Sequence, residues 1–239
     1  IEDGYLLCGV KNDDSFLVKV KKENGDILFS KTFENGGSDA FEHLLLVNNQ
    51  IFAVGYTNSE DKYNNFYSEG ESSLHILDLD GTIIKNIDIK SYMSHAYRIK
   101  SINNDIYISG LTNGAEDYAL IKMNPSGEVI WSNVYGGSDS DHCFAMDVND
   151  KNEVFLSGHT TSQTANWDTY TMKIDNDGNK FTFPAGTKIE QAGLLGIWCG
   201  KGEVAGLRTN FGLGQSGDSV ALFDVTGNRV DAVTFGSVQ

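Results

Sequence analysis

Three polar residues at matching places in a repeated sequence could act on one ligand together. Asp39, His95 and His142 each stand two residues before an aromatic residue, which is Phe41, Tyr97 or Phe144. A carboxylate and two imidazoles that converge on one axis are suitable donors for a divalent metal ion. The same position also suits a turn cap, neighbouring repeats would hold these atoms far apart, and no fourth ligand is evident. They are therefore candidate ligand-binding residues, and we predict no metal and no cofactor.

Aromatic residues in two predicted loops are the second set of candidates. The segment 58–72 (NSEDKYNNFYSEGES) is about ten residues longer than its counterparts, and the segment 161–168 (TSQTANWD) carries a smaller insertion. Rings among Asn, Ser and acidic side chains suit the face of a sugar or a protein partner. The alternative is that the rings fold back and cap their own repeat. The candidate residues are Tyr63, Phe66, Tyr67 and Trp167.

Catalytic and metal-binding motifs are missing from the sequence. No Ser lies in a G-x-S-x-G turn, no glycine-rich phosphate loop opens a helix, and no carboxylate pair can be assigned to a cleft. Asp175, Asp177 and Asn179 do not follow the order of a calcium loop, and Asx-Gly turn chemistry explains the segment without a metal. The three cysteines, Cys8, Cys143 and Cys199, have no C-x-x-C spacing, so we expect buried free thiols.

Charge and composition narrow the class of partner. The 239 residues carry a formal net charge of −15, which argues against nucleic acid and anionic membranes as partners. No apolar run approaches the ~18–20 residues of a membrane-spanning helix. The sequence starts at Ile1 without a basic and apolar leader, so either a signal peptide has been removed or the chain is a fragment. We favour a fragment, because the repeat starts at its second strand.

The candidate residues are positioned by a repeat of four short predicted strands, a to d. One whole repeat reads as strands over 38–48, 50–57, 73–79 and 82–89. One glycine lies in each turn between strands c and d, and another lies at the end of strand b in the next repeat. The second follows the first by 30, 29 and 31 residues, in the pairs Gly25 and Gly55, Gly81 and Gly110, and Gly127 and Gly158. A period of ~40–50 residues with four strands is typical of a β-propeller blade. The b-to-c and d-to-a loops should then open together around the mouth of a central channel.

A known repeat resembles these segments. The repeated motif has an aromatic residue in strand d, then a GGS junction, and then G-x-T at the end of strand b. It is similar to the bacterial seven-bladed β-propeller repeat of secreted and surface proteins. The residues that match are Trp131, Ser132, Tyr135, Gly136, Gly137, Ser138, Gly158 and Thr160, and in an earlier copy Phe29, Ser30, Phe33, Gly36, Gly37, Ser38, Gly55 and Thr57. The resemblance covers about residues 4–180 and implies a propeller fold and an extracellular location.

The C-terminal segment departs from the repeat and resembles another family. Its motifs FTFPAGTKI, LLGIWCG, RTNFGL and GDSVALFDVTGNRVDAVTFGS are similar to the second half of the bacterial lamin-tail domain, an immunoglobulin-like β-sandwich. The strands of the first half of that family are not present. We therefore expect two parts, propeller repeats over 1–180 amounting to three and a half blades and a partial lamin-tail-like β domain over 181–239.

Three functions remain open at this point. The first is a secreted or cell-surface binding or adhesion module whose b-to-c and d-to-a loops take a glycan or a protein. The second is a propeller enzyme that acts on polysaccharide, although no catalytic residue is identified. The third is a structural spacer of a larger surface protein. For all three we expect an all-β fold, no membrane span, and missing blades or strands supplied by the parent chain or by another copy.

Overall fold

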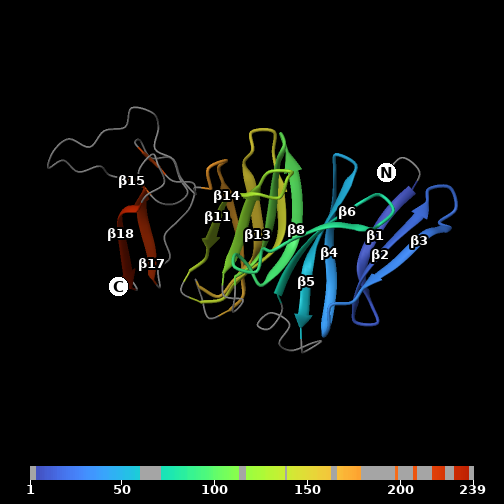
Figure 1. Cartoon of the computed structure of the whole chain (residues 1–239). Helices are drawn as coiled ribbons and strands as arrows, with labels where there is room; N and C mark the ends of the chain where they lie inside the picture. The colour runs from blue at the N-terminus through green and yellow to red at the C-terminus, as the bar shows by residue number, and fades with distance from the viewer. Residues whose placement is uncertain are drawn as a thin grey trace.

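The fold is all-β, as the sequence predicts. The structure is a computed structural model and describes residues 4–59, 71–112, 117–137, 139–162, 166–178, 197–198, 207–208, 217–223 and 229–236. No helix occurs in these residues, so none with the length and hydropathy of a membrane crossing is found among them. In Figure 1 the colours run from the blue strands at the N-terminus on one side, through cyan and green strands, to the yellow and orange strands before residue 180.

Four antiparallel sheets carry most of the strands. The first contains β1 (Gly4–Lys11), β2 (Asp14–Lys21) and β3 (Ile27–Phe33), and the second β4 (Ser38–Val47), β5 (Gln50–Ser59), β6 (Glu71–Leu77) and β7 (Ile83–Ile87). The third contains β8 (His95–Ile102), β9 (Asp105–Leu111), β10 (Tyr118–Met123) and β11 (Val129–Tyr135), and the fourth β12 (Asp141–Val148), β13 (Val154–Thr160) and β14 (Asp168–Ile174). Each sheet follows chain order, as blades of a propeller do.

Two further pairs of strands follow in the C-terminal part. β15 (Ile197–Trp198) and β16 (Leu207–Arg208) pair in parallel, and β17 (Gly217–Phe223) and β18 (Arg229–Gly236) form an antiparallel hairpin. The hairpin strands lie within the motif GDSVALFDVTGNRVDAVTFGS of the C-terminal segment.

Turn chemistry explains why the strands pair in this order. Asn48 and Asn49 between β4 and β5, and Asn103 and Asn104 between β8 and β9, all have positive φ angles from 49° to 71°. Two consecutive residues of this kind form the tight turn whose twist matches a hairpin, and asparagine tolerates it better than most residues. The hairpin registers of the second and third sheets are therefore set locally.

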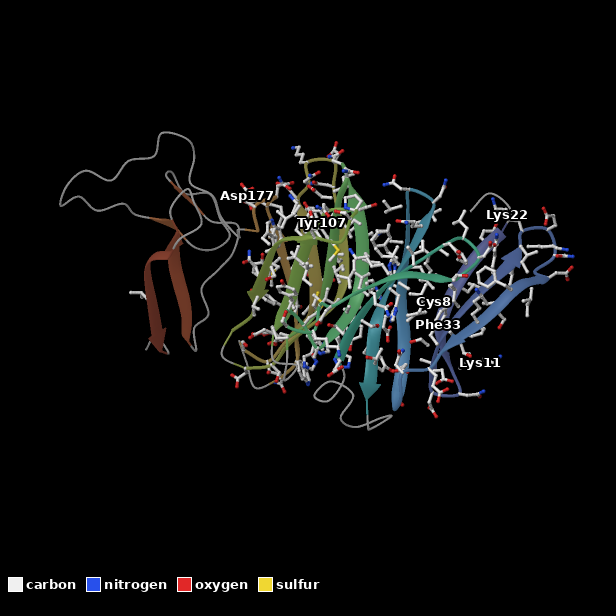
Figure 2. The ribbon with its side chains drawn as sticks, viewed as in Figure 1. Cys8, Lys11, Lys22, Phe33, Tyr107 and Asp177 are labelled. Carbon is white, nitrogen blue, oxygen red and sulfur yellow. The ribbon has the colours of Figure 1, made fainter. Side chains whose placement is uncertain are left out.

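The three larger apolar clusters of the described residues fill the spaces between successive sheets. The first unites Leu17 of β2 with Phe41, Ile51, Ala53 and Leu77 of the second sheet. The second lies between the second and third sheets, and the third lies between the third and fourth sheets. Each intermediate sheet thus buries both faces against its neighbours, which is how blades of a propeller are stabilised. Figure 2 shows Cys8 and Phe33, which pack against the first cluster, on the first sheet.

The expected free thiols lie in these interfaces. Cys143 is fully buried and Cys8 is half-buried, and neither forms a disulfide. Burial raises the pKa of Cys8 to about 11 and that of Cys143 to about 12. Cys199 lies outside the described residues.

The first strands of the second, third and fourth sheets, β4, β8 and β12, contact one another in sequence, and we call them the inner strands. They share one irregularity. Each carries a bulge, between Phe41 and His43, Ala96 and Arg98, and Cys143 and Ala145. The bulged residues are Glu42, Tyr97 and Phe144. Opposite them stand the strand-end glycines, where an added Cβ would lie 1.7–1.8 Å from the backbone oxygens of Ala40, His95 and His142. These glycines are thus required by close contact with the neighbouring strand.

Candidate functional site

The predicted site residues fall at one end of the sheets. The b-to-c connections (β5–β6, β9–β10, β13–β14) and the d-to-a connections (β3–β4, β7–β8, β11–β12) all lie at this end because the strands alternate in direction. We call it the loop face. Tyr63, Phe66 and Tyr67 lie outside the described residues. Asp39, His95, His142 and Trp167 are described.

Asp39 is not equivalent to His95 and His142. The bulged residues of the three strands are structurally equivalent, so Glu42 corresponds to Tyr97 and Phe144. The sequence alignment placed Phe41 at that position and is therefore shifted by one residue. Asp39 instead corresponds to Asp141. Asp39 Oδ2 accepts a hydrogen bond from Asn35 N at 2.8 Å, and Asp141 Oδ2 accepts one from Gly137 N at 2.6 Å. Both carboxylates therefore cap the connection that leads into an inner strand.

The predicted trio does not form a ligand set. Within the described ranges, no group of three His, Cys, Asp or Glu side chains is placed to hold one metal ion. His95 is fully buried, its Nδ1 lies 3.1 Å from Ser94 Oγ, and its ring contacts Tyr56 and Tyr97. Each of the three residues is thus engaged within or beside its own sheet.

A continuous row of rings runs across the second, third and fourth sheets near the loop face. Ring centroids of successive members lie 4.2–6.2 Å apart, the range of favourable aromatic contacts. His142 joins the same group beside Phe144, His159 and Trp167. We call this set the ring row; its members are Tyr56, His95, Tyr97, Phe144, His142, His159 and Trp167.

Trp167 ends the ring row at the surface. It precedes β14 and is 52% exposed. Its ring centroid lies 4.2 Å from that of His159 and 4.9 Å from that of His142. The two imidazoles therefore support one side of the indole, while about half of the side chain stays open to solvent. This is the described residue of the predicted loops that is best placed to meet a ligand.

Hydrogen bonds hold the fourth sheet's loops near Trp167 in place. Ser162 Oγ donates to Asp141 Oδ2 at 2.9 Å, and Asp139 N donates to Ser162 Oγ at 3.0 Å. Thr161 N donates to Ser140 O at 2.9 Å. The start of the b-to-c loop is thus tied to the d-to-a connection. A Cβ on Gly137 would lie 2.3 Å from Ser162 Cβ, so close packing of these loops explains that glycine of the junction motif.

His159 is a site residue that sequence reasoning missed. The sequence indicates only a packed or surface histidine, whereas the structure pairs it with His142 across β12 and β13. Burial lowers the pKa of His159, which favours its neutral form. The signal that could have found it is the strand-end Gly158: this glycine pairs with Cys143, so the next residue must oppose His142.

A second missed group lies on the inner strands beside the ring row. Glu42 occupies the bulge position of β4, where burial raises its pKa and the charge of Arg98 opposes that rise. Arg98 Nη1 donates to Tyr97 O at 2.8 Å. The charge of Glu42 also contributes to the raised pKa of Cys8. An acid on β4 and a base on β8 are therefore close enough to interact across the second and third sheets.

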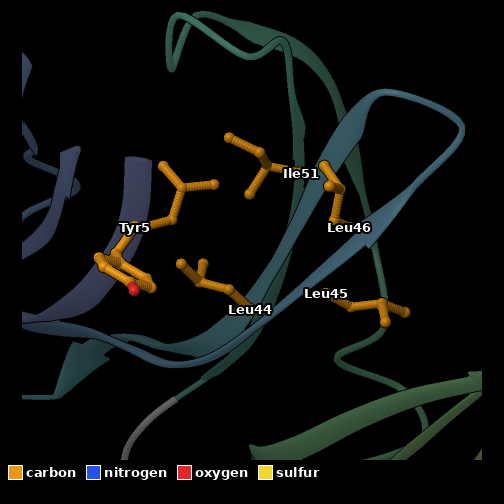
Figure 3. Close-up of a pocket in the computed structure, with 6 residues that line it drawn as sticks. Tyr5, Leu44, Leu45, Leu46 and Ile51 are labelled. Atoms are coloured by element: carbon orange, nitrogen blue, oxygen red, sulfur yellow. The ribbon is translucent and has the colours of Figure 1, made fainter. Parts of the chain in front are cut away.

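An apolar hollow of about 280 Å³ lies away from the ring row. Its lining comes from β1, β4 and β5 (Figure 3), and consists of Tyr5, Leu6, Leu44, Leu45, Leu46 and Ile51. Ligand sites usually combine an apolar wall with a few convergent polar groups. Tyr5 is the one residue of this lining with a polar side chain, so the ring row is the better candidate site.

No family model matches this sequence, and no curated protein matches it. Solved structures match at low identity. The subtype N10 neuraminidase-like protein of A/little yellow-shouldered bat/Guatemala is 13% identical, with a TM-score of 0.48, and the match covers 72% of this chain and 58% of that chain. A neuraminidase-like protein from A/bat/Guatemala is 11% identical, with a TM-score of 0.47, covering 72% of this chain and 51% of that chain.

A WD40 domain also matches. The Neurospora crassa Pan2 WD40 domain is 12% identical, with a TM-score of 0.36, and the match covers 73% of this chain and 63% of that chain. The chain therefore spans 51–63% of the length of these three structures. Similarity at TM-scores this low carries no information about ligand or activity.

Proposed function

We propose that this chain is part of a secreted or cell-surface binding module, and that it contacts a glycan through Trp167 on the loop face. The observation that carries the proposal is the indole of Trp167, 52% exposed and backed by His142 and His159. An aromatic ring on a sheet-supported loop offers a flat apolar face for the C–H side of a sugar ring. The proposal is one of binding and not of catalysis.

Neighbouring polar groups support a sugar at this place. Asn166 is exposed and Asp168 is half-buried, on either side of Trp167. Side chains of these types donate to and accept from hydroxyl groups. The net charge of −15 favours a neutral ligand over a polyanion. A basic protein segment is the other partner class that the acidic chain suits, and it is a separate outcome of the test.

We also propose that further blades complete the arrangement, supplied by the parent chain or by another copy. The first sheet supports this, because Tyr5, Leu7 and Leu28 on it are 57%, 53% and 41% exposed. Large apolar side chains grouped on a sheet face are usually covered in the assembled molecule.

The C-terminal part has an adhesive or anchoring role in this proposal. We divide the chain at residue 180, with propeller repeats over 1–180 and a lamin-tail-like domain over 181–239. The hairpin of β17 and β18 supports this division, because it is formed by the residues that carry the lamin-tail resemblance.

A glycan array probed with the fluorescently labelled chain tests the proposed function. We expect retention of the chain by a defined group of neutral glycans. Binding to no glycan, together with capture by basic peptides on a companion array, would transfer the proposal to protein ligands. Binding to neither array would contradict a binding role for this chain.

A further inference from the structure

His142 and His159 form a cross-strand pair at the loop-face end of the fourth sheet. The two residues are direct partners in the antiparallel register of β12 and β13. His142 Nδ1 and His159 Nε2 lie 3.3 Å apart, with ring centroids 5.2 Å apart. Two ring nitrogens therefore face one another at short range, and both side chains are partly exposed.

This separation matches the geometry of two ligands on one metal ion. Zinc–nitrogen bonds of about 2.0–2.1 Å at the tetrahedral angle place two nitrogens about 3.3–3.4 Å apart. In the hydrogen-bonded pair, one of the two nitrogens carries the hydrogen and the other accepts it. A neutral imidazole can carry that hydrogen on its other nitrogen instead. Both facing lone pairs then become donors, and no net proton needs to leave a neutral pair.

We propose that His142 and His159 bind a zinc ion, with solvent molecules as the remaining ligands. Surrounding rings fix the orientation of both imidazoles before the metal arrives. Trp167 lies 4.2 Å from His159 and 4.9 Å from His142, and Phe144 lies 5.0 Å from His159, all between ring centroids. Preorganised ligands lose less conformational freedom on binding, which favours affinity.

The site differs from a structural zinc site. Structural sites use four protein ligands and supply folding energy. Here two ligands come from a sheet that is already closed by its own hydrogen bonds and by the apolar cluster between the third and fourth sheets. The zinc ion is therefore reversibly bound and the fold forms without it. This proposal does not rest on glycan binding at Trp167.

Calorimetric titration of the untagged, metal-free chain with Zn²⁺ tests the site. The variants are His142→Gln and His159→Gln, with Tyr5→Phe on the first sheet as the control that keeps both imidazoles and the rings around them. Loss of a residue that only supports a metal ligand costs roughly 10- to 100-fold in metal affinity. We expect each histidine variant, which loses a ligand itself, to lose at least this much, while the control binds like the parent. Co²⁺ should give the visible absorption of a tetrahedral site in the parent and not in the histidine variants.

A second measurement covers the case in which a histidine variant does not fold. Diethylpyrocarbonate modifies exposed histidines, and mass spectrometry locates the modification in the unchanged chain. Zn²⁺ should protect His142 and His159 and leave the reactivity of His43 unchanged. Equal modification with and without Zn²⁺, or unchanged zinc affinity in folded histidine variants, would overturn the proposal.

Discussion

Gly178, in the turn after β14, lies against the indole of Trp131 on β11 of the preceding sheet. A Cβ at Gly178 would lie 3.4 Å from Trp131 Cδ2 and Cε2, and Trp131 Nε1 donates to Asn176 O at 3.2 Å in the same turn. The relationship recurs between other sheets. A Cβ at Gly81 would lie 3.1 Å from Phe29 Cε2, and one at Gly127 would lie 2.0 Å from Ile87 Cδ1. Turn glycines thus align successive sheets.

The first prediction concerns this contact. Gly178→Ala places a Cβ at a positive φ of 85° and 2.3 Å from Asn133 Nδ2, which donates to Gly178 O at 3.0 Å. We expect a loss of about 1–2 kcal/mol from the backbone conformation and about 1 kcal/mol more from the displaced hydrogen bond. Gly25→Ala is the matched control, because φ is 77° there and no atom lies within 4 Å. Urea denaturation compares the two, and equal losses would argue against the contact.

The second prediction concerns Trp131 as a packing residue. Phe29 and Trp131 hold matching places on the last strand of their repeats, which predicts packing residues between sheets. In the structure Phe29 packs against the first cluster and Trp131 against the third. Trp131→Ala should therefore lower the free energy of unfolding by about 3–5 kcal/mol. Trp167→Ala, on the exposed indole, should change it by about 0.5 kcal/mol or less. A Trp131 variant that unfolds like the parent would contradict this role.

The third prediction is a loss of stability below neutral pH. Burial lowers the pKa of His75, of His43 and of His159. Because these folded-state pKa values lie below the unfolded value of ~6.5, the unfolded chain binds protons more readily as the pH falls through that value. The contribution of these histidines to the free energy of unfolding is therefore fully present above pH ~6.5. It is lost as the pH falls toward their lowered pKa values.

His75→Gln isolates one contribution to this pH dependence. His75 is buried and its Nδ1 lies 2.7 Å from Asn86 Oδ1, a contact that a glutamine amide can replace. We expect a shallower decrease in the free energy of unfolding between pH 7 and pH 5 than in the parent. The raised pKa of Glu42 acts in the opposite direction in both proteins and cancels in the comparison. Parallel curves for parent and variant would exclude His75 as a source.

The fourth prediction concerns the long loop of the second sheet. Tyr63, Phe66 and Tyr67 lie outside the described residues, so their role stays a prediction from sequence. Replacing all three with Ser should leave the melting temperature within a few degrees, because surface loop residues contribute little to packing. Binding of an array-identified ligand should be lost in calorimetry. A collapse of the fold would identify the rings as structural caps.

Much of the fold was predictable because local rules act on each segment. Predicted strands over 38–48 and 82–89 correspond to β4 and β7 within two residues at each end. Asx-Gly turns and alternating apolar residues encode hairpins without knowledge of distant contacts. The candidate site was less predictable. A β-bulge shifts register by one residue, so Asp39 was aligned wrongly with His95 and His142, and the partnership of His142 with His159 depends on that register.

Binding of a glycan at Trp167 is the central claim, and calorimetry with the strongest array-identified glycan tests it most directly. The variants are Trp167→Ala and, as a matched control, Tyr5→Ala, which removes an aromatic ring of 57% exposure from the first sheet. We predict that Trp167→Ala loses about 1–3 kcal/mol of binding free energy or more, as removal of an aromatic contact does, with an unchanged melting temperature, while Tyr5→Ala binds like the parent. Unchanged affinity in a folded Trp167→Ala protein would contradict the account.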